Sequence, residues 1–591
     1  MTESVVPVLV VGAGPTGLTL ANELARHGVR PRIIDRGPAP ATTSRALVVQ
    51  PRTLEILDDM GVVDQAIAAG TSASNLTITF AEKTVDLDFA DQLIGPQNYT
   101  AYPEPRTVSQ QDTERILTER LSEQGVEIER GRALTDLTQD GQTVTVSLRG
   151  EDGTIETLQC RWVIGCDGAH SAVRKAAGIP FAGSTYRDEF IMADAELDWK
   201  LPHGGLYGFP SPAGIFAAFS MPGDNRYRIF GNFPPGPEGP SAEYSEPTHE
   251  EFQAMVDERV PFPATVVKEH WVTRYRVHSR TVPHYREGRV FLVGDAAHVH
   301  SPAGAQGMNT GIQDAYNLGW KLAHVERGVA DESLLDTYEA ERHPIGVQLL
   351  KTTDRLFSVF GGQNPLARLA RGRVAPVLAG HLLTRSWLRR RFIGLLAQLR
   401  LRYPDSALNA QDGSGWRDAP APGDRAREAD VTIDGRQSHL YEVFRGTHHT
   451  VLLFTGLDDD ARPAVELCRI AEQLEQTYPG MVKAHVITAE RFADHPAALG
   501  DSTRSAHRQY GVAAASAFVV RPDKYIGYRG RPVDAERLMS DLARRVSRGA
   551  SPRPGTPAPA TAECSTSGRR RFRSVRTNRR PKFPARHPDT R

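Results

Sequence analysis

The alternation of apolar and polar positions predicts a strand, a helix and a second strand at the start of the chain. An apolar, β-branched run covers residues 5–11, and apolar positions then recur at helical spacing over residues 16–27. Gly28 is placed to end this helix, and residues 32–35 form another short apolar run. Two such runs joined by a helix form a βαβ unit, so the first domain is predicted to be α/β with a parallel sheet.

Later segments continue this pattern, with one interruption. A helix is predicted over residues 111–125, and buried strands over residues 162–165 and 289–293. Residues 186–271 contain short alternating strands separated by proline and glycine, which predicts a mainly antiparallel sheet inserted into the first domain. Helices are predicted to follow from about residue 310 to residue 401.

A linker rich in proline, alanine and glycine at residues 420–423 precedes a third region. Strand and helix patterns over about 431–546 predict a small α/β domain there. The end of the chain is rich in Pro, Ser, Thr and Arg and has no periodicity, so it is not expected to pack. We therefore predict three parts: residues 1–400 with the inserted sheet, residues 420–547, and a disordered tail at 548–591.

Composition adds little about chemistry but excludes some classes of protein. The hydrophobic share of 40% and the charged share of 24% are ordinary for a globular protein, and no membrane-spanning run or leader sequence is recognisable. The four cysteines lack the spacing of a redox pair or zinc site, which favours free thiols and a cytoplasmic protein. Residues 549–591 carry eleven basic and two acidic residues. A basic tail can bind nucleic acid or an acidic surface, but we expect a disordered extension without a nucleic-acid partner.

A glycine-rich turn follows the first predicted strand and reads Gly12-Ala-Gly14-Pro15-Thr16-Gly17. Glycines permit a tight turn and let a pyrophosphate approach the backbone at the N-terminus of the next helix. Asp35 ends the second strand, where its carboxylate can accept a hydrogen bond from a ribose hydroxyl. A glycine turn alone is equally compatible with a purely structural role. The complete strand–turn–helix–strand unit predicts a dinucleotide site, without indicating which dinucleotide.

Two further motifs resemble those of class A FAD-dependent aromatic hydroxylases, the p-hydroxybenzoate hydroxylase and phenol or pentachlorophenol monooxygenase type. One is the Cys-Asp-Gly segment at 163–174, and the other is the Gly-Asp segment at 289–298, continued by residues 301–315. The resemblance covers about residues 5–400 and implies a Rossmann-type FAD-binding domain. Ala305 departs from it, because relatives usually carry a glycine there.

The resemblance implies where FAD is held. Its contacts fall on Gly12, Gly14, Pro15, Thr16, Gly17, Asp35, Arg36, Arg45, Gln110, Asp167, Asp295, Pro302, Gly307, Met308 and Asn309. Asp295 is suited to accept hydrogen bonds from ribityl hydroxyls, although an N-cap role for the next helix is also compatible. The helix that begins near Gly307 would direct backbone N–H groups at the flavin pyrimidine. Asp167 and Arg174 are expected to serve both the flavin and a transiently docked NADPH or NADH.

The reaction that the resemblance implies is hydroxylation of an aromatic substrate, phenolic or polyketide-like, with dioxygen and through a flavin hydroperoxide. Loss of the phenol proton accelerates such a step, so a base is expected in the inserted sheet. Tyr207 is the candidate catalytic residue and His284 a second one, although a tyrosine there is more often a packing residue. His298 and His300 have no clustered partners in the sequence, so no metal site is predicted.

The third region resembles the thioredoxin-like C-terminal domain of the phenol hydroxylase branch. It contains Cys468 but no CxxC pair, which excludes disulfide exchange. We expect it to serve packing or a homodimer contact. Three alternatives to a hydroxylase stay open: an epoxidase or a reductase of the same fold, and a flavin-binding protein without turnover. The spacing of the six tryptophans argues against a flavin-dependent halogenase, which carries a WxWxIP segment.

Overall fold

The structure is a computed structural model. It describes residues 5–41, 46–80, 83–95, 98–211, 213–233, 247–301, 304–360, 385–457, 462–489 and 495–546. The chain divides into two units, Met1–Thr556 and Pro557–Arg591. The second unit and the predicted tail from residue 548 lie outside the described residues. Among the described helices, none is long and apolar enough to cross a membrane.

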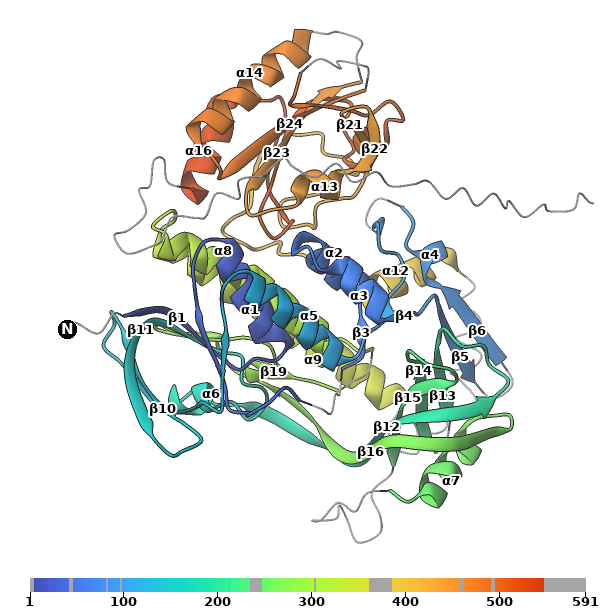
Figure 1. The fold of residues 1–591 in the computed structure, drawn as a ribbon. Coiled ribbons are helices and arrows are strands. Elements are labelled where there is room, and N and C mark those ends of the chain that lie inside the picture. The colour runs from blue at the N-terminus through green and yellow to red at the C-terminus, as the bar shows by residue number, and fades with distance from the viewer. Residues whose placement is uncertain are drawn as a thin grey trace, which may run out of the picture. The chain divides into compact units, whose positions relative to one another are not determined.

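The first sheet confirms the predicted βαβ unit (Figure 1). Its order is β17 (Arg286–Glu287), β18 (Val290–Leu292), β11 (Ile155–Gly165), β1 (Val6–Val11), β2 (Arg32–Asp35) and β8 (Ile128–Arg130), with β9 (Ala133–Gln139) and β10 (Val144–Arg149) joined through β11. Strand β1 is parallel to both β2 and β11, and the connecting helix is α1 (Pro15–Arg26). Strand β1 is a continuous apolar run, and its last four residues are all buried. This is expected for a strand in a sheet that is covered on both faces.

Helices α5 (Gln110–Glu123) and α8 (Gly307–Glu326) pack against α1. The remaining helices of this half are α2 (Pro51–Asp59), α3 (Val63–Ala69), α4 (Phe89–Gln92), α6 (Ala172–Ala176), α7 (His249–Arg259), α9 (Asp336–Phe360) and α12 (Ser386–Leu396), with 3-10 turns η1 (Gly294–Ala296) and η2 (Glu332–Leu335). A small sheet contains β3 (Val48–Val49), β7 (Arg106–Thr107) and β4 (Thr71–Ser72). Nearly all of α8 is buried, so this helix is the central support of the domain.

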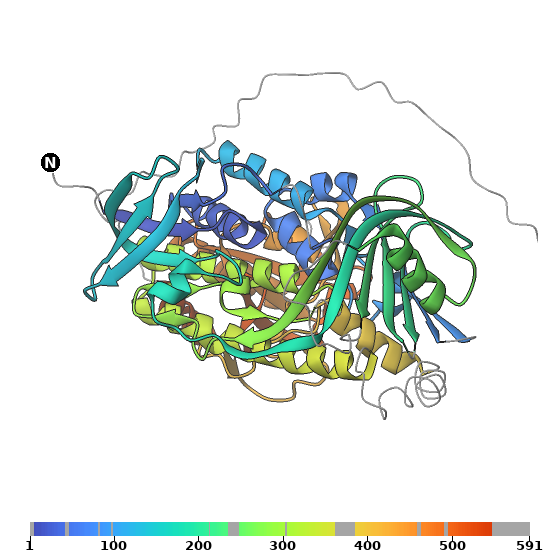
Figure 2. The ribbon, with the colours of Figure 1, turned by 90° about the horizontal axis from the view of Figure 1, so that it is seen from below.

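The inserted sheet is larger than the sequence predicted. Its order is β19 (His298–Val299), β16 (Ala264–Thr281), β12 (Ala182–Trp199), β15 (Arg226–Phe233), β14 (Gly214–Ser220), β13 (Gly205–Ser211), β5 (Asn75–Phe80) and β6 (Lys83–Asp88). Strands β5 and β6 come from an earlier part of the chain, and β5 pairs with β13 in parallel. The long antiparallel strands β12 and β16 run side by side, as teal and green ribbons in Figure 2.

The two faces of this sheet differ. One face packs against α7 through a cluster that includes Tyr207, Phe209, Phe216 and Tyr227. The opposite face, here called the aromatic face, consists of Tyr186, Phe190, Ile215, Ala217, Phe219, Phe230, Tyr275 and Val277. Neighbours along β12 alternate between the faces, since Phe190 belongs to the aromatic face and Ile191 to the α7 face.

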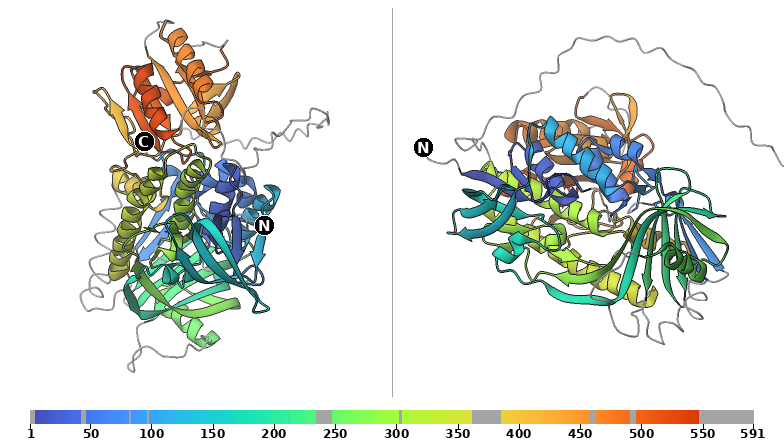
Figure 3. Two further views of the ribbon diagram at one scale, coloured as in Figure 1. Left: turned by 90° about the vertical axis from the view of Figure 1, so that its left-hand side faces the viewer. Right: turned by 60° about the horizontal axis from the view of Figure 1, so that its bottom comes forward.

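The C-terminal region folds around a third sheet. Its order is β20 (Ala410–Asp412), β27 (Ile526–Gly530), β26 (Ala514–Val520), β23 (His449–Gly456), β24 (Val482–Thr488), β25 (Ala498–Gly500), β21 (Asp430–Ile433) and β22 (Arg436–His439). Helices α14 (Arg462–Thr477) and α16 (Ala535–Arg545) supply residues to the core on one face, and α13 (Leu440–Phe444) and α15 (Ser505–Gln509) to the core on the other. The left panel of Figure 3 shows α14 and α16 in orange and red beside the sheet.

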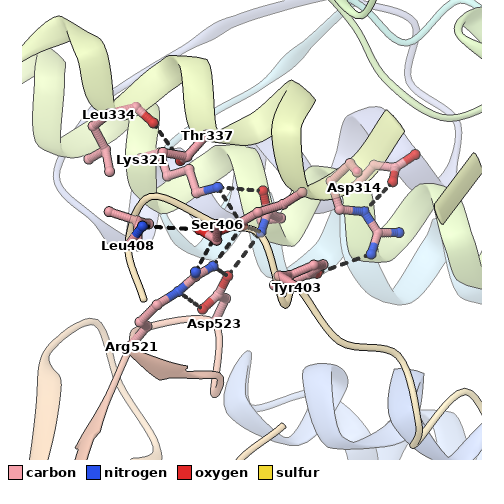
Figure 4. A network of polar contacts seen from close by, with 12 residues as sticks. Asp314, Lys321, Leu334, Thr337, Tyr403, Ser406, Leu408, Arg521 and Asp523 are labelled. Atoms are coloured by element: carbon pink, nitrogen blue, oxygen red, sulfur yellow. Dashed lines mark hydrogen bonds and ion pairs between the residues drawn. The ribbon is translucent and has the colours of Figure 1, made fainter. Parts of the chain in front are cut away.

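A buried polar network joins this region to α8 and α9 (Figure 4). The Glu341 carboxylate pairs with Lys321 at 2.7 Å and with Arg521 at 2.5 Å, and Arg521 also pairs with Asp523 at 2.5 Å. Ser406 donates a further hydrogen bond to Glu341 at 2.5 Å. All four charged side chains are at most 1% exposed. Charges this deeply buried are tolerated only when they are paired, so the network fixes the C-terminal region to α8 and α9.

Candidate functional site

The glycine turn after β1 is shaped by close packing. Gly12 has a φ of +105°, and a Cβ on it would lie 2.5 Å from the carbonyl oxygen of Cys166. A Cβ on Gly17 would lie 1.9 Å from the carbonyl oxygen of Gly12. A Cβ on Gly14, by contrast, would have no atom within 4 Å. Gly12 and Gly17 therefore allow α1 and β11 to approach the turn, whereas Gly14 faces open space at the helix N-terminus.

Asp35 lies where the sequence predicted it, at the end of β2. Its two carboxylate oxygens accept hydrogen bonds from the backbone N–H groups of Ala13 and Gly37, both at 2.7 Å. A carboxylate has about four acceptor positions, so lone pairs remain for a ribose hydroxyl. Arg36, the next residue, is exposed. Asp35 thus orients the glycine turn and stays available to a ligand.

The turn η1 brings Asp295 close to the same helix end. Gly294 has a φ of +62°, and a Cβ on it would lie 2.8 Å from Thr16 Oγ1. A Cβ on Gly311, in α8, would lie 2.5 Å from the same atom. Thr16 is therefore wedged between η1 and α8, which places α1, η1 and α8 in contact. Asp295 is exposed although its neighbours are buried, as expected for a residue that contacts a ligand.

Helix α8 begins at Gly307, and the side chain of its N-cap residue, Gln306, makes no capping hydrogen bond to the helix. Gly307 and Met308 are half-buried, and their backbone N–H groups belong to the first turn, where a helix has no partners of its own. Asn309 is also predicted to contact FAD, and its side-chain amide donates to the carbonyls of Val48 at 2.8 Å and Ala305 at 2.9 Å. It is fully buried and holds the loop in place, which sequence reasoning did not foresee.

Two of the predicted residues, Arg45 and Pro302, lie outside the described residues. Gln110 is the first residue of α5 and donates to Glu114 at 2.8 Å, while its oxygen accepts from the backbone N–H of Ala46 at 3.4 Å. Ala305 has a φ of +52°, a left-handed conformation that favours glycine. The departure at this position therefore has a structural cost.

Asp167 and Arg174 are engaged in the fold. Asp167 accepts hydrogen bonds from Ser171 Oγ at 2.5 Å and from the backbone N–H of Ala172 at 2.6 Å, and so holds the start of α6. Arg174 donates to the carbonyl of Ala296 in η1 at 3.1 Å. Burial raises the pKa of Asp167 and lowers the pKa of Arg174. These residues link α6 to the Asp295 turn, and a role toward a nicotinamide stays a prediction.

Tyr207 lies on the α7 face, packed against Trp199 and Tyr227. Its hydroxyl donates to the carbonyl of Pro202, and burial raises its pKa to about 12. The side chain is 4% exposed and belongs to the core opposite the aromatic face. The structure therefore gives Tyr207 a packing environment. His284, the second candidate, lies beside Glu287 at 3.2 Å, about one third exposed.

His298 and His300 do not form a metal site with other ligands among the described residues. His298 Nε2 lies 2.7 Å from Asp314 Oδ2, and both side chains are 1% exposed. His300 Nδ1 lies 2.7 Å from the carbonyl of Ser301, while its buried Nε2 has no hydrogen-bond partner in the described part of the chain. Burial lowers the pKa of His300 to about 4. This orphan nitrogen lies beside the start of α8 and indicates that a ligand completes the site.

Two residues that sequence reasoning missed also border this region. Arg228 forms a bidentate ion pair with Asp194, with distances of 2.6 and 2.8 Å, and donates to the carbonyl of Ala46 at 3.1 Å. The pair therefore connects the inserted sheet to the segment that follows Arg45. Neither residue lies in a recognisable motif, so no local signal in the sequence could have identified them.

The site residues fit FAD. Open space at Gly14 suits a pyrophosphate, Asp35 has acceptor positions for a ribose, and Asp295 is exposed beside them. Further along the chain from Asp295, His300 has a buried nitrogen without a partner in the described part of the chain, and α8 begins at Gly307 without a side-chain cap. A long ligand with a pyrophosphate, hydroxyls and a polar ring system would satisfy these groups.

Comparisons with known proteins agree with this geometry. Residues 5–353 match the family described as FAD binding domain. The chain is 34% identical to 6-methylpretetramide 4-monooxygenase of Streptomyces rimosus, covering 93% of this chain and 97% of that protein. It is 32% identical to pentachlorophenol 4-monooxygenase of Sphingobium chlorophenolicum, covering 88% and 93%. The solved structure of anhydrotetracycline hydroxylase from Streptomyces rimosus superposes with a TM-score of 0.71 at 31% identity, covering 93% of this chain and all of that one.

Proposed function

Because the chain belongs to the FAD-binding domain family of aromatic and polyketide monooxygenases, we propose that it hydroxylates an aromatic substrate, phenolic or polyketide-like, with dioxygen and NADPH or NADH. Bound FAD would carry the two-electron chemistry between the reduced nicotinamide and dioxygen. The observation that carries the proposal is the convergence of Gly14, Asp295 and the uncapped start of α8 on one site.

The protein's own contribution is binding, orientation and exclusion of water. Backbone N–H groups at the starts of α1 and α8 would hold negative charge, and Asp35 and Asp295 would accept hydrogen bonds from hydroxyl groups. The aromatic face would hold the substrate ring, since Phe190 stacks on Phe230 with centroids 5.3 Å apart and Tyr275 lies 6.0 Å from Phe190. An apolar wall of this kind keeps water from the reacting atoms.

The C-terminal region is proposed to be thioredoxin-like. The order β27-β26-β23-β24, with α14 between β23 and β24 and α16 after β27, supports this proposal. Its structural role is supported by the buried network at Glu341. A homodimer, a cytoplasmic location, and domain limits at residues 400, 420 and 547 are further proposals.

The test is a reconstitution followed by a substrate screen. The purified protein is expected to carry FAD or to bind it with the absorbance change of a flavoprotein. Phenols and aromatic polyketides are then screened for accelerated oxidation of NADPH and NADH, and products are checked by mass for the gain of one oxygen. A protein that cannot be reconstituted with FAD would contradict the proposal. Peroxide release without product would identify a wrong substrate.

A further inference from the structure

The aromatic face carries a polar pair that the sequence did not indicate. Tyr186, on β12, packs edge-on against Phe190 with centroids 6.3 Å apart, and it belongs to the same cluster as Phe230 and Tyr275. Tyr207 lies on the other face of the sheet, against α7. If the substrate ring lies on the aromatic face, Tyr186 can reach it and Tyr207 cannot.

Tyr186 is directed at a carboxylate. Its hydroxyl donates a hydrogen bond to Asp354 Oδ1, on α9, and Ser279 Oγ on β16 donates to Asp354 Oδ2 at 2.9 Å. Both oxygens of Asp354 therefore accept hydrogen bonds from hydroxyl donors. The phenolic oxygen of Tyr186 keeps lone pairs with which it can accept a hydrogen bond from a ligand.

The pair also lies beside the loop that leads to α8. Burial and Asp354 raise the pKa of Tyr186 above its ordinary value, and the nearby side chain of Ser301 opposes this shift. Ser301 is fully buried and comes directly before the loop that ends at Gly307. The Nε2 of His300 would lie 3.6 Å from a Cβ on Gly307, and Asp354 opposes the lowering of the His300 pKa that burial causes.

We propose that Tyr186 and Asp354 form the proton relay that accepts the proton of a substrate hydroxyl group. This inference rests on the proposed function. The substrate O–H bond breaks as its proton moves to the Tyr186 oxygen, and the proton of Tyr186 moves at the same time to Asp354 Oδ1. The products are a bound phenolate, a neutral tyrosine and a neutral Asp354, so charge and protons balance. Asp354 is partly exposed and can return the proton to water.

The environment explains why two residues are needed. A tyrosine with a raised pKa stays protonated near neutral pH and cannot act alone as a base. The carboxylate supplies the acceptor, and the tyrosine extends its reach to the aromatic face. Titratable and charged groups near the pair include His300 in the loop, and His278 and Arg280 on β16, which both contact Thr185 beside Tyr186.

The test compares Tyr186→Phe and Asp354→Asn with Tyr227→Phe as the matched control, because Tyr227 lies in the core on the α7 face. The probe is the phenolic compound that the wild-type holoenzyme hydroxylates fastest. At neutral pH we expect both relay variants to lose on the order of 100-fold in kcat, and the control to stay within about twofold. Above the solution pKa of the phenol, the rates of the relay variants are expected to recover, because the substrate then arrives ionised. Asp354→Glu should retain part of the activity.

A second readout requires no turnover. The ultraviolet difference spectrum of the probe bound to oxidised enzyme reports its ionisation, and its apparent pKa is expected to be at least about one unit higher in Tyr186→Phe than in wild type. FAD content and the unfolding midpoint serve as controls for folding. An unchanged apparent pKa, or an equal loss of kcat at every pH, would overturn the relay while leaving the hydroxylase intact. A wild-type protein that hydroxylates no phenolic compound overturns the proposed function and the relay together.

Discussion

The two ends of helix α8 use polar groups in opposite ways. At its start, Gly307 and Met308 have uncapped backbone N–H groups, and His300 Nε2 has no hydrogen-bond partner in the described part of the chain. Further along, Lys321 is fully buried, and its ammonium group contacts Asn317 at 2.8 Å and Glu341 at 2.7 Å. His300 Nε2 and the Lys321 ammonium group are both buried, so burial alone does not explain the difference.

The difference separates a ligand site from a scaffold. A buried polar group without a partner costs free energy, and it persists where a ligand supplies the partner. A buried charge with complete partners holds two parts of the chain in one arrangement. This contrast predicts that changes at the Glu341 network affect stability, whereas changes at the loop ends affect ligand binding.

The largest expected effect is on stability. Glu341→Ala leaves Lys321 and Arg521 buried without their carboxylate, and should lower the free energy of unfolding by about 3–5 kcal/mol. The control is Glu332→Ala. The Glu332 side chain is 46% exposed and pairs with Arg286, so its removal should lower the free energy of unfolding by less than about 1 kcal/mol. Denaturant unfolding measures both. Equal losses of unfolding free energy in the two variants would show that the buried network contributes no more to stability than the exposed ion pair.

The next effect concerns ligand affinity. Gly14→Ala places a methyl group in open space, so the apoprotein should keep its stability, while FAD affinity falls by about 100-fold, or about 3 kcal/mol. Gly12→Ala meets the carbonyl of Cys166 and should destabilise the apoprotein as well. Calorimetric titration of apoprotein with FAD and thermal unfolding separate the two outcomes. Unchanged FAD affinity in Gly14→Ala would show that the pyrophosphate lies elsewhere.

A third prediction concerns the pH dependence of stability and the buried carboxyl group of Glu428. Glu428 accepts from Ala429 at 2.9 Å and Tyr441 at 3.1 Å, and burial raises its pKa to about 8. The folded protein therefore keeps a proton that the unfolded chain loses near pH 4.5, so stability falls as pH rises from 4.5 to 8. Glu428→Gln should be neutral at pH 4 and more stable than wild type by up to about 4 kcal/mol at pH 8. A constant difference across this range would contradict the assignment.

The smallest effect is expected at the loop before α8. Ala305 has a positive φ, and Ala305→Gly should relieve strain of about 1 kcal/mol or less. The added freedom of glycine in the unfolded chain offsets part of this gain. The unfolding midpoint measures the net change. A clear loss of stability would show that the alanine methyl group makes a packing contact that outweighs the strain.

Local sequence patterns were sufficient to predict the nucleotide-binding unit and the cofactor motifs. Hydrophobic periodicity and glycine positions are local, so β1, α1 and β2 were predicted to within a residue of their observed ends. The helix and strands of the C-terminal region followed from the same patterns, as β23, α14 and β24 show. Asp295 is exposed and Gly14 faces open space, and the roles that the motifs implied for both stay predictions.

Which polar residues contact one another depends on how distant segments of the chain pack. Tyr186 and Asp354 are 168 positions apart, and Arg521 and Glu341 are 180 positions apart, so no local pattern connects them. The face that Tyr207 occupies depends on strand register, since one step along a strand reverses the direction of a side chain. The membership of β5 and β6 in the inserted sheet likewise depends on a long-range pairing with β13. Local composition fixes the turns and elements, whereas the proton relay and the scaffold network arise from contacts between distant segments.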